Sequence, residues 1–172
     1  MVESGTSRME FPGSMLRRGF WIYVWRVSSP SGELLYVGRT GDNSSPNAVA
    51  PYSRMGQHLG FVKAQNALRK HLLNRNVDPE TCAKFELIAH GPIFPEITKS
   101  SGADRQQLMA QHLPLRNLVG AMEKALAHDL SVAQYTVLNV VKWSHPYDPK
   151  VWQSVRAAFA EHFPKLNTKS LG

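Results

Sequence analysis

Hydrophobic residues near the start of the chain follow the pattern of a β-hairpin. Residues 20–27 are mostly aromatic and β-branched, and residues 34–37 resume this character after the turn-forming segment 28–32. Two such runs joined by a short segment rich in Ser, Pro and Gly are typical of antiparallel strands. A third strand is predicted at 84–89, where apolar residues again predominate.

Apolar residues spaced three and four positions apart predict several helices in the rest of the chain. Pro51 suits the first turn of one helix, which we expect to end near Gly60. A second helix precedes the turn at Asp78, and a long helix begins near Asp104 and is expected to be disturbed at Pro114. The defining apolar positions after Gly60 are Leu68, Leu72 and Leu73; Leu115, Leu118, Val119, Met122 and Leu126; and Val151, Val155, Ala158, Phe159 and Phe163.

The remaining segments complete the expected organisation. We expect a loop at 91–102, and the pattern at 135–141 fits either a strand or an irregular packed segment. Residues 1–18 lack periodicity and are predicted to be a flexible leader. The main domain is expected to span 19–142, with a helical extension, 143–172, packed on it. The sum is an α+β fold, a small antiparallel sheet flanked by helices.

Composition narrows the class of protein. The 172 residues suffice for one domain with a substantial core, and 42% are hydrophobic, as in an ordinary globular protein. The single cysteine, Cys82, excludes an internal disulfide framework and a multi-cysteine zinc site. No apolar run is long enough to predict a membrane span, and the N-terminus lacks an apolar stretch of signal-peptide length. We therefore expect a cytoplasmic protein.

Positive charge is concentrated in one part of the chain. Lys and Arg number 20 against 13 Asp and Glu, a net charge of +7, which favours polyanionic partners. Residues 43–77 contain no acidic residue. A stretch of one sign suggests a phosphate-facing surface, although a basic surface without a partner remains the alternative. Its basic residues are Arg54, Lys63, Arg69, Lys70 and Arg75, with His58 and His71 between them.

Four polar residues of the hairpin and first helix could serve phosphodiester hydrolysis. Tyr23 and Tyr36 lie on neighbouring predicted strands, and Arg54 and His58 lie one helical turn apart. The reaction needs an activated water, stabilisation of phosphoryl charge and help for the leaving oxygen. A tyrosine serves as a base only where cations favour its phenolate form. The alternative is that the tyrosines are core aromatics and that Arg54 and His58 belong to a solvated helix face.

Glu123 occupies an unusual position within the long helix. Its one-turn neighbours include Val119, Leu126 and Ala127, so the carboxylate borders the apolar stripe. Such a group must be paired, neutral or bound to a cation, and a salt bridge to Lys or Arg is the alternative to a metal. One carboxylate can hold Mg²⁺ when water and substrate phosphate complete its ligands.

These residues, taken in order, resemble the GIY-YIG nuclease family. The matching pieces are Trp21-Ile22-Tyr23, Tyr36-Val37-Gly38, Arg54 with His58, the helix bearing Glu123, and Asn139 within Val137-Leu138-Asn139-Val140. The resemblance covers about residues 19–142. It implies a three-stranded antiparallel sheet flanked by helices, and one divalent ion, Mg²⁺ or Mn²⁺, bound by Glu123.

The resemblance also implies roles for individual residues. Tyr23 would be the general base or its partner, Tyr36 would position water or phosphate, and Arg54 would stabilise the transition state. His58 would assist proton transfer, and Asn139 would brace the site by hydrogen bonds. Gly38 would keep the strand end open for the phosphate. We further expect nucleic-acid contacts from Gly38, Arg39, Lys63, Arg69, Lys70, Arg75 and Lys142.

Two features depart from the family pattern. Trp21 replaces the first glycine of the motif, and the loop between Gly38 and Arg54 is long enough to contact DNA or to set specificity. The sequence therefore predicts a metal-dependent endonuclease acting on DNA, with RNA as the other candidate substrate and a homodimer as one way to cut both strands. The alternatives are a nucleic-acid-binding module of the same fold without catalysis, and a structural or protein-interaction role for the last helix.

Overall fold

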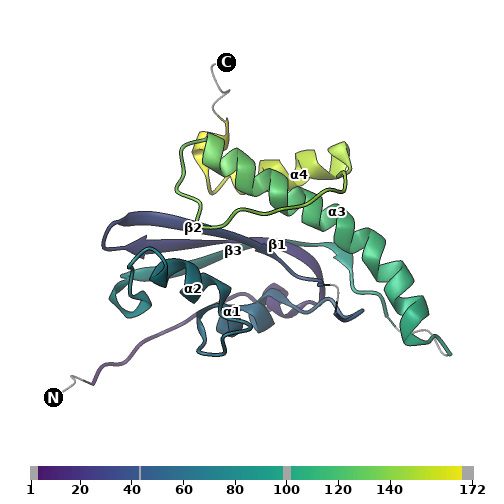
Figure 1. Cartoon of the computed structure of the whole chain (residues 1–172), viewed down its shortest axis with the longest axis horizontal. Helices are drawn as coiled ribbons and strands as arrows, with labels where there is room; N and C mark the ends of the chain where they lie inside the picture. The colour runs from purple at the N-terminus through teal and green to yellow at the C-terminus, as the bar shows by residue number, and fades with distance from the viewer. Residues whose placement is uncertain (1–3, 43, 99–101, 168–172) are drawn as a thin grey trace.

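The computed structural model describes residues 4–42, 44–98 and 102–167, and these form an α+β fold around a three-stranded antiparallel sheet (Figure 1). The strands are β1 (Gly19–Ser29), β2 (Gly32–Arg39) and β3 (Lys84–Pro95), in the order β2-β1-β3. Both pairs are antiparallel, so β1 is the central strand. The predicted fold class is confirmed.

Helices cover both faces of the sheet (Figure 1). The short helices α1 (Pro51–Leu59) and α2 (Ala67–Leu73) lie on one face, and α3 (Arg105–Val132) and α4 (Pro149–Ala160) lie on the other. Three 3-10 turns, η1 (Gly13–Leu16), η2 (Pro79–Thr81) and η3 (Pro164–Asn167), connect or end these elements.

Alternating side chains of β1 build two separate cores. Ile22 and Val24 belong to the cluster under α3 and α4, whereas Tyr23 and Trp25 belong to the cluster under α1 and α2. This follows from the period of two along a strand. The expected C-terminal extension contributes to the first cluster through α4 and η3, with Trp152, Val155, Phe159, Phe163 and Leu166 buried there. Its residues 168–172 lie outside the described part of the chain.

Two expectations about secondary structure are wrong. The β3 strand continues to Pro95, into the segment expected to be a loop, and Gly19 and Phe20 pair with its end. Pro114 does not disturb α3, which runs unbroken through it. Proline removes one hydrogen bond to the carbonyl four residues earlier. Here Pro114 and Ala110 are both exposed, so water can solvate the freed carbonyl of Ala110.

The segment 135–141, which the sequence left undecided, is an irregular chain held against the outer edge of β2. Leu35 N donates to Thr136 O at 2.8 Å, and Leu138 N donates to Leu35 O at 2.7 Å. These bonds form one isolated parallel bridge between Leu35 and Val137. The segment therefore occupies the β2 edge without extending the sheet by a full strand.

Part of the expected flexible leader is structured. Residues 13–16 form η1, and Met15 is buried. Arg18 donates to Glu96 at 2.6 Å, which ties the start of β1 to the segment after β3. Residues 1–3 lie outside the described part of the chain.

Within residues 4–42, 44–98 and 102–167, no helix combines the length and the apolar character needed to cross a membrane.

Candidate active site

The hairpin places both candidate tyrosines on the face of the sheet that α1 covers. Tyr23 pairs with Gly38, and Trp25 pairs with Tyr36, so the two tyrosines lie two pairs apart on adjacent strands and share one face. Pro51 starts α1 with its fixed backbone angle, as expected. The helix then carries His58 down onto the hairpin, where it is buried.

Tyr23 and His58 form the closest polar contact of the site. The Tyr23 hydroxyl and His58 Nε2 lie 2.6 Å apart in a buried hydrogen bond. The Tyr36 ring lies 5.2 Å from the His58 ring and 5.6 Å from the His71 ring, between centroids. His58 therefore stands between the two phenols, as a shared proton partner would.

Arg54 holds its charge near this trio. Its Nη2 atom lies 3.4 Å from Asp42 Oδ2, and Nη1 donates to Gln57 Oε1 at 3.3 Å. The buried Nε atom has no hydrogen-bond partner among the described residues. Because Nη1 and Nη2 make only long contacts, they are the part of the guanidinium available to a phosphate oxygen, whereas the buried Nε is closed to solvent.

Burial has a larger effect on the pKa values of Tyr23 and Tyr36 than the nearby cations have. Desolvation raises the pKa of Tyr23 well above its ordinary value and the pKa of Tyr36 to about 12, although Arg54 lowers both. Arg54 alone therefore does not favour a phenolate here, and a bound divalent ion would have to add to its field. Burial, assisted by the charge of Arg54, lowers the pKa of His58 to about 4. A neutral imidazole thus faces a protonated phenol.

Glu123 approaches from the opposite face of the sheet. It forms an ion pair with Arg39, with Arg39 Nε 2.9 Å from Glu123 Oε2, and both side chains are 13% exposed. The salt bridge weighed above as the alternative to a metal is thus present. Burial raises the pKa of Glu123 to about 7, although Arg39 lowers it. The carboxylate consequently sits at the balance between its charged and neutral forms near neutral pH.

Glu123 and the two tyrosines interact electrostatically from opposite faces of the sheet. The charge of Glu123 raises the pKa of both Tyr23 and Tyr36, so the carboxylate lies within electrostatic range of the phenols. Asn139 lies on the β2 edge, where its Oδ1 accepts from Val37 N at 3.0 Å and its Nδ2 donates to Val37 O at 2.8 Å. This bracing agrees with the role that the resemblance implies for Asn139.

Gly38 has a different environment from the one expected. A Cβ built on Gly38 would lie 2.5 Å from the Tyr23 ring, so the ring covers this glycine. The space expected to admit a phosphate at the strand end is therefore filled by Tyr23. Glycine is needed here because it allows the phenol to lie flat against β2.

Two of the expected nucleic-acid contacts are occupied within the protein. Arg39 pairs with Glu123, as described above. Arg69 stacks over Phe61 at 4.1 Å, donates to Leu59 O, and is only 15% exposed. Neither is a free surface cation. Four others have exposed side chains, as a phosphate-facing surface requires: Lys63, Lys70, Arg75 and Lys142.

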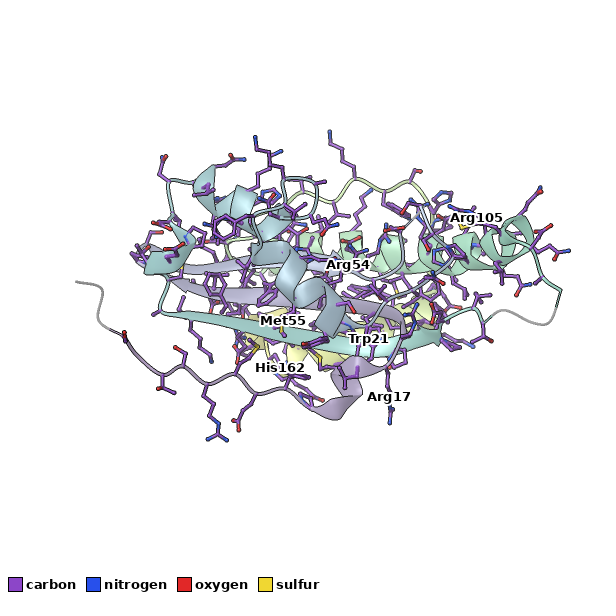
Figure 2. All side chains as sticks on the ribbon, turned by 90° about the horizontal axis from the view of Figure 1, so that it is seen from below. Arg17, Trp21, Arg54, Met55, Arg105 and His162 are labelled. Carbon is purple, nitrogen blue, oxygen red and sulfur yellow. The ribbon has the colours of Figure 1, made fainter. Side chains whose placement is uncertain are left out.

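The Trp21 side chain lies close to Arg17 and against the end of β3 (Figure 2). Its ring packs against Gly91, where an added Cβ would lie only 2.8 Å from the ring. Its Nε1 donates to Arg17 O at 3.1 Å. Its backbone nitrogen still bonds to Thr40 across the hairpin at 2.8 Å. The missing motif glycine is thus compensated by a glycine on β3.

The long loop after Gly38 is packed on the start of α3. Buried His112 bonds through Nε2 to Asp42 O at 2.8 Å, and Arg105 donates to Ser44 O at 2.6 Å. Ala48 is fully buried and its carbonyl accepts from Gly19 N. Asn43 lies outside the described residues. These contacts orient Asp42 toward Arg54, a partner that the sequence did not suggest.

The donor atoms suit a divalent ion held jointly with substrate. Among the described residues, no group of three His, Cys, Asp or Glu side chains could form a metal site. Glu123 is a hard oxygen ligand whose ionised form a divalent cation would favour, and water and phosphate would supply the other ligands. Arg39 competes for the same carboxylate. The residues therefore fit a weakly held Mg²⁺ or Mn²⁺ rather than a closed metal cage.

Comparison with protein-family models, curated proteins and solved structures finds no match to this chain. The GIY-YIG resemblance therefore depends on the residues and geometry given above.

The buried histidine predicts a pH-dependent stability. Because the folded pKa of His58 is about 4 against an ordinary 6.5, its neutral form stabilises the fold at neutral pH. This contribution, about 3 kcal/mol, is lost as the pH falls from about 6.5 to about 4. Denaturant unfolding of His58→Gln at several pH values should show a smaller loss over this window than the wild type. His128→Gln, at an exposed histidine, should retain the full loss.

Proposed function

We propose that this protein is a metal-dependent endonuclease that hydrolyses phosphodiester bonds, with DNA as its substrate. The observation that carries the proposal is the hydrogen bond between Tyr23 and neutral His58, 2.6 Å long, beside Arg54. A buried phenol that faces a neutral imidazole and a nearby guanidinium serves proton transfer at a phosphate better than it serves packing. The GIY-YIG resemblance supports the same reaction.

The proton transfer follows from these pKa values. The pKa of Tyr23 is too high for a free phenolate, so its hydroxyl would accept a proton from the attacking water while it passes its own proton to His58 Nε2. Neutral His58 is available for this at all pH values above about 4. The relay forms an imidazolium in place of a phenolate, and because burial and Arg54 disfavour that cation, the negative charge of the phosphate would have to stabilise it.

Other residues would hold the substrate during this step. Arg54 would donate to the phosphoryl oxygens through Nη1 and Nη2, whose present contacts are long. Tyr36 would hydrogen-bond the water or the phosphate. A divalent ion bound by Glu123 would stabilise charge on the phosphoryl and leaving oxygens. Asn139 would keep the β2 edge in register with the phenols.

The ion pair between Arg39 and Glu123 favours a second candidate function. A carboxylate already neutralised by a guanidinium could be purely structural, which fits a nucleic-acid-binding module without catalysis. Such a module would bind DNA with a steep dependence on salt and would be insensitive to EDTA. The nuclease instead requires a divalent ion for cleavage.

Nicking of supercoiled plasmid distinguishes these candidates. We expect cleavage with Mg²⁺ or Mn²⁺ and none with EDTA. Tyr36→Phe removes one hydroxyl, conserves the packed ring, and should slow cleavage about 10²-fold through lost positioning. Tyr147→Phe, at a partly exposed ring remote in sequence from these residues, is the control and should cleave like the wild type.

The outcome against the proposal is equally clear. A wild-type protein that binds the plasmid but leaves it intact with both ions would support the binding module. Mapping the product ends on a defined DNA then reports whether one strand or both are cut, and so whether a homodimer acts.

A further inference from the structure

A basic cleft lies next to the candidate site, between α3 and the chain that follows Asn139. It has a volume of about 630 Å³. Figure 1 shows this connecting chain running back along α3 toward α4. The lining residues include no carboxylate: Arg116, Lys124, Val140, Val141, Lys142, Trp143, Ser144 and His145.

The cleft is built around the ring of Trp143, which rests on α3. A Cβ on Gly120 would lie 2.4 Å from this ring, so only glycine allows the close approach. Trp143 Nε1 donates to Asn117 O at 2.9 Å, and Lys124 Nζ donates to Trp143 O at 2.8 Å. Arg116, Gly120 and Lys124 are spaced by four and share one helix face.

Two guanidiniums stack on this ring. The Arg39 and Arg116 guanidinium carbons lie 4.7 Å and 4.6 Å from the Trp143 ring centroid. Arg39 is paired with Glu123, and Arg116 donates from Nη1 to Asn117 Oδ1 at 3.1 Å, while its buried Nε has no hydrogen-bond partner among the described residues. Desolvation and then the charge of Arg39 lower the pKa of Arg116, although Asp42 raises it. The fold therefore concentrates positive charge here at an electrostatic cost.

An anion would relieve this cost. Arg116 uses Nη1 for Asn117, which leaves Nη2 for a phosphate oxygen, and exposed Lys142 adds a second charge at the rim. The Trp143 ring joins Arg116 to Arg39, and Arg39 touches Glu123, so the cleft is continuous with the candidate metal ligand.

We infer that this cleft binds a backbone phosphate of the DNA next to the one that is cut, and that Arg116 and Lys142 make the contact. The inference rests on the proposed function for its substrate class. It assigns the path of the strand: from the phenols, across the β2 edge, and along α3 toward the end of the connecting chain.

The test measures binding of a short labelled DNA duplex over a range of NaCl concentrations, with EDTA present. For B-DNA, each lost phosphate contact lowers the slope of log K against log salt by about 0.9. Arg116→Gln and Lys142→Gln should each lower the slope by this amount. Lys150→Gln, an exposed lysine on α4 outside the cleft, should leave it unchanged. Because Lys142 is exposed on an irregular segment, its variant should fold normally.

The two proposals can fail separately. If both cleft variants bind with the wild-type slope, or if the wild type does not bind the duplex, the inference is wrong. If the wild type cleaves the plasmid with Mg²⁺ and the cleft variants bind DNA normally, the proposed nuclease function would hold and the proposed role of the cleft would be wrong. Slopes reduced as expected, together with no cleavage, would establish the cleft and overturn the nuclease.

Discussion

Replacing Glu123 with glutamine should slow plasmid cleavage about 10³-fold or more. The carboxylate is the ligand proposed for the divalent ion, and the charge stabilisation that such an ion supplies is worth several kcal/mol in the transition state. An uncharged amide oxygen has the same shape but binds the ion far more weakly. Initial cleavage rates over a range of Mg²⁺ concentrations measure the effect.

The change also removes the ion pair between Glu123 and Arg39, so the variant must be compared while it is folded. Burial raises the pKa of Glu123 to about 7, so the neutral carboxyl, which glutamine resembles in shape, is populated near neutral pH. Because the largely buried Arg39 loses its partner, the melting temperature should still fall, and cleavage rates are measured below the melting temperature of the variant. Glu33→Gln, at a more exposed carboxylate at the start of β2, is the control for losing one negative charge. If Glu123→Gln cleaves as fast as Glu33→Gln, then Glu123 holds no catalytic ion.

Replacing Tyr23 with phenylalanine should slow cleavage about 10³-fold, within the range typical of a lost general base or acid. The substitution keeps the ring that covers Gly38 and removes only the hydroxyl that contacts His58. It leaves the buried His58 Nε2 without a partner, which costs about 1–3 kcal/mol of stability. DNA affinity measured with EDTA should be unchanged, because the hydroxyl is not a phosphate ligand in this proposal.

The control for this variant is Tyr52→Phe, on the same helix as His58 but with a half-exposed ring. It should cleave at the wild-type rate. A Tyr23→Phe protein that is folded, binds DNA and still cleaves normally would show that the hydrogen bond to His58 is structural only.

The hairpin and its tyrosines could be predicted because they depend on local pattern. Strand character on both sides of a turn sets antiparallel pairing, and parity then places Tyr23 and Gly38 on one face. The same parity places Arg39 on the other face, opposite Tyr36. Arg39 could therefore have been assigned to the α3 side from the sequence, although it was predicted to contact nucleic acid.

The sequence does not predict which residues far apart in the chain contact one another. That Arg39 pairs with Glu123, or that Asp42 faces Arg54, depends on how the loop and α3 pack and not on spacing. The strength of desolvation was also inaccessible, because it depends on total burial. The extent to which burial raises the pKa of Tyr23 and Tyr36 therefore comes from the structure alone.

The continuation of α3 through Pro114 shows another limit of predicting helices from sequence. A proline predicts a lost hydrogen bond, but whether the helix breaks depends on the solvation of the freed carbonyl and on packing on both sides. The spacing of Arg116, Gly120 and Lys124 was a usable signal for the cleft. It was overlooked because glycine within a helix suggests weakness before it suggests contact with a ring.

The bonds from Thr136, Leu138 and Asn139 to β2 have a consequence for assembly. They use the outward backbone groups of Leu35 and Val37, which would otherwise be open to a strand from another molecule. Two copies therefore cannot merge their sheets through this border. A dimer that cuts both DNA strands would have to associate through side chains on another surface. The covered edge of β2 also cannot add strands from further molecules to form a polymer.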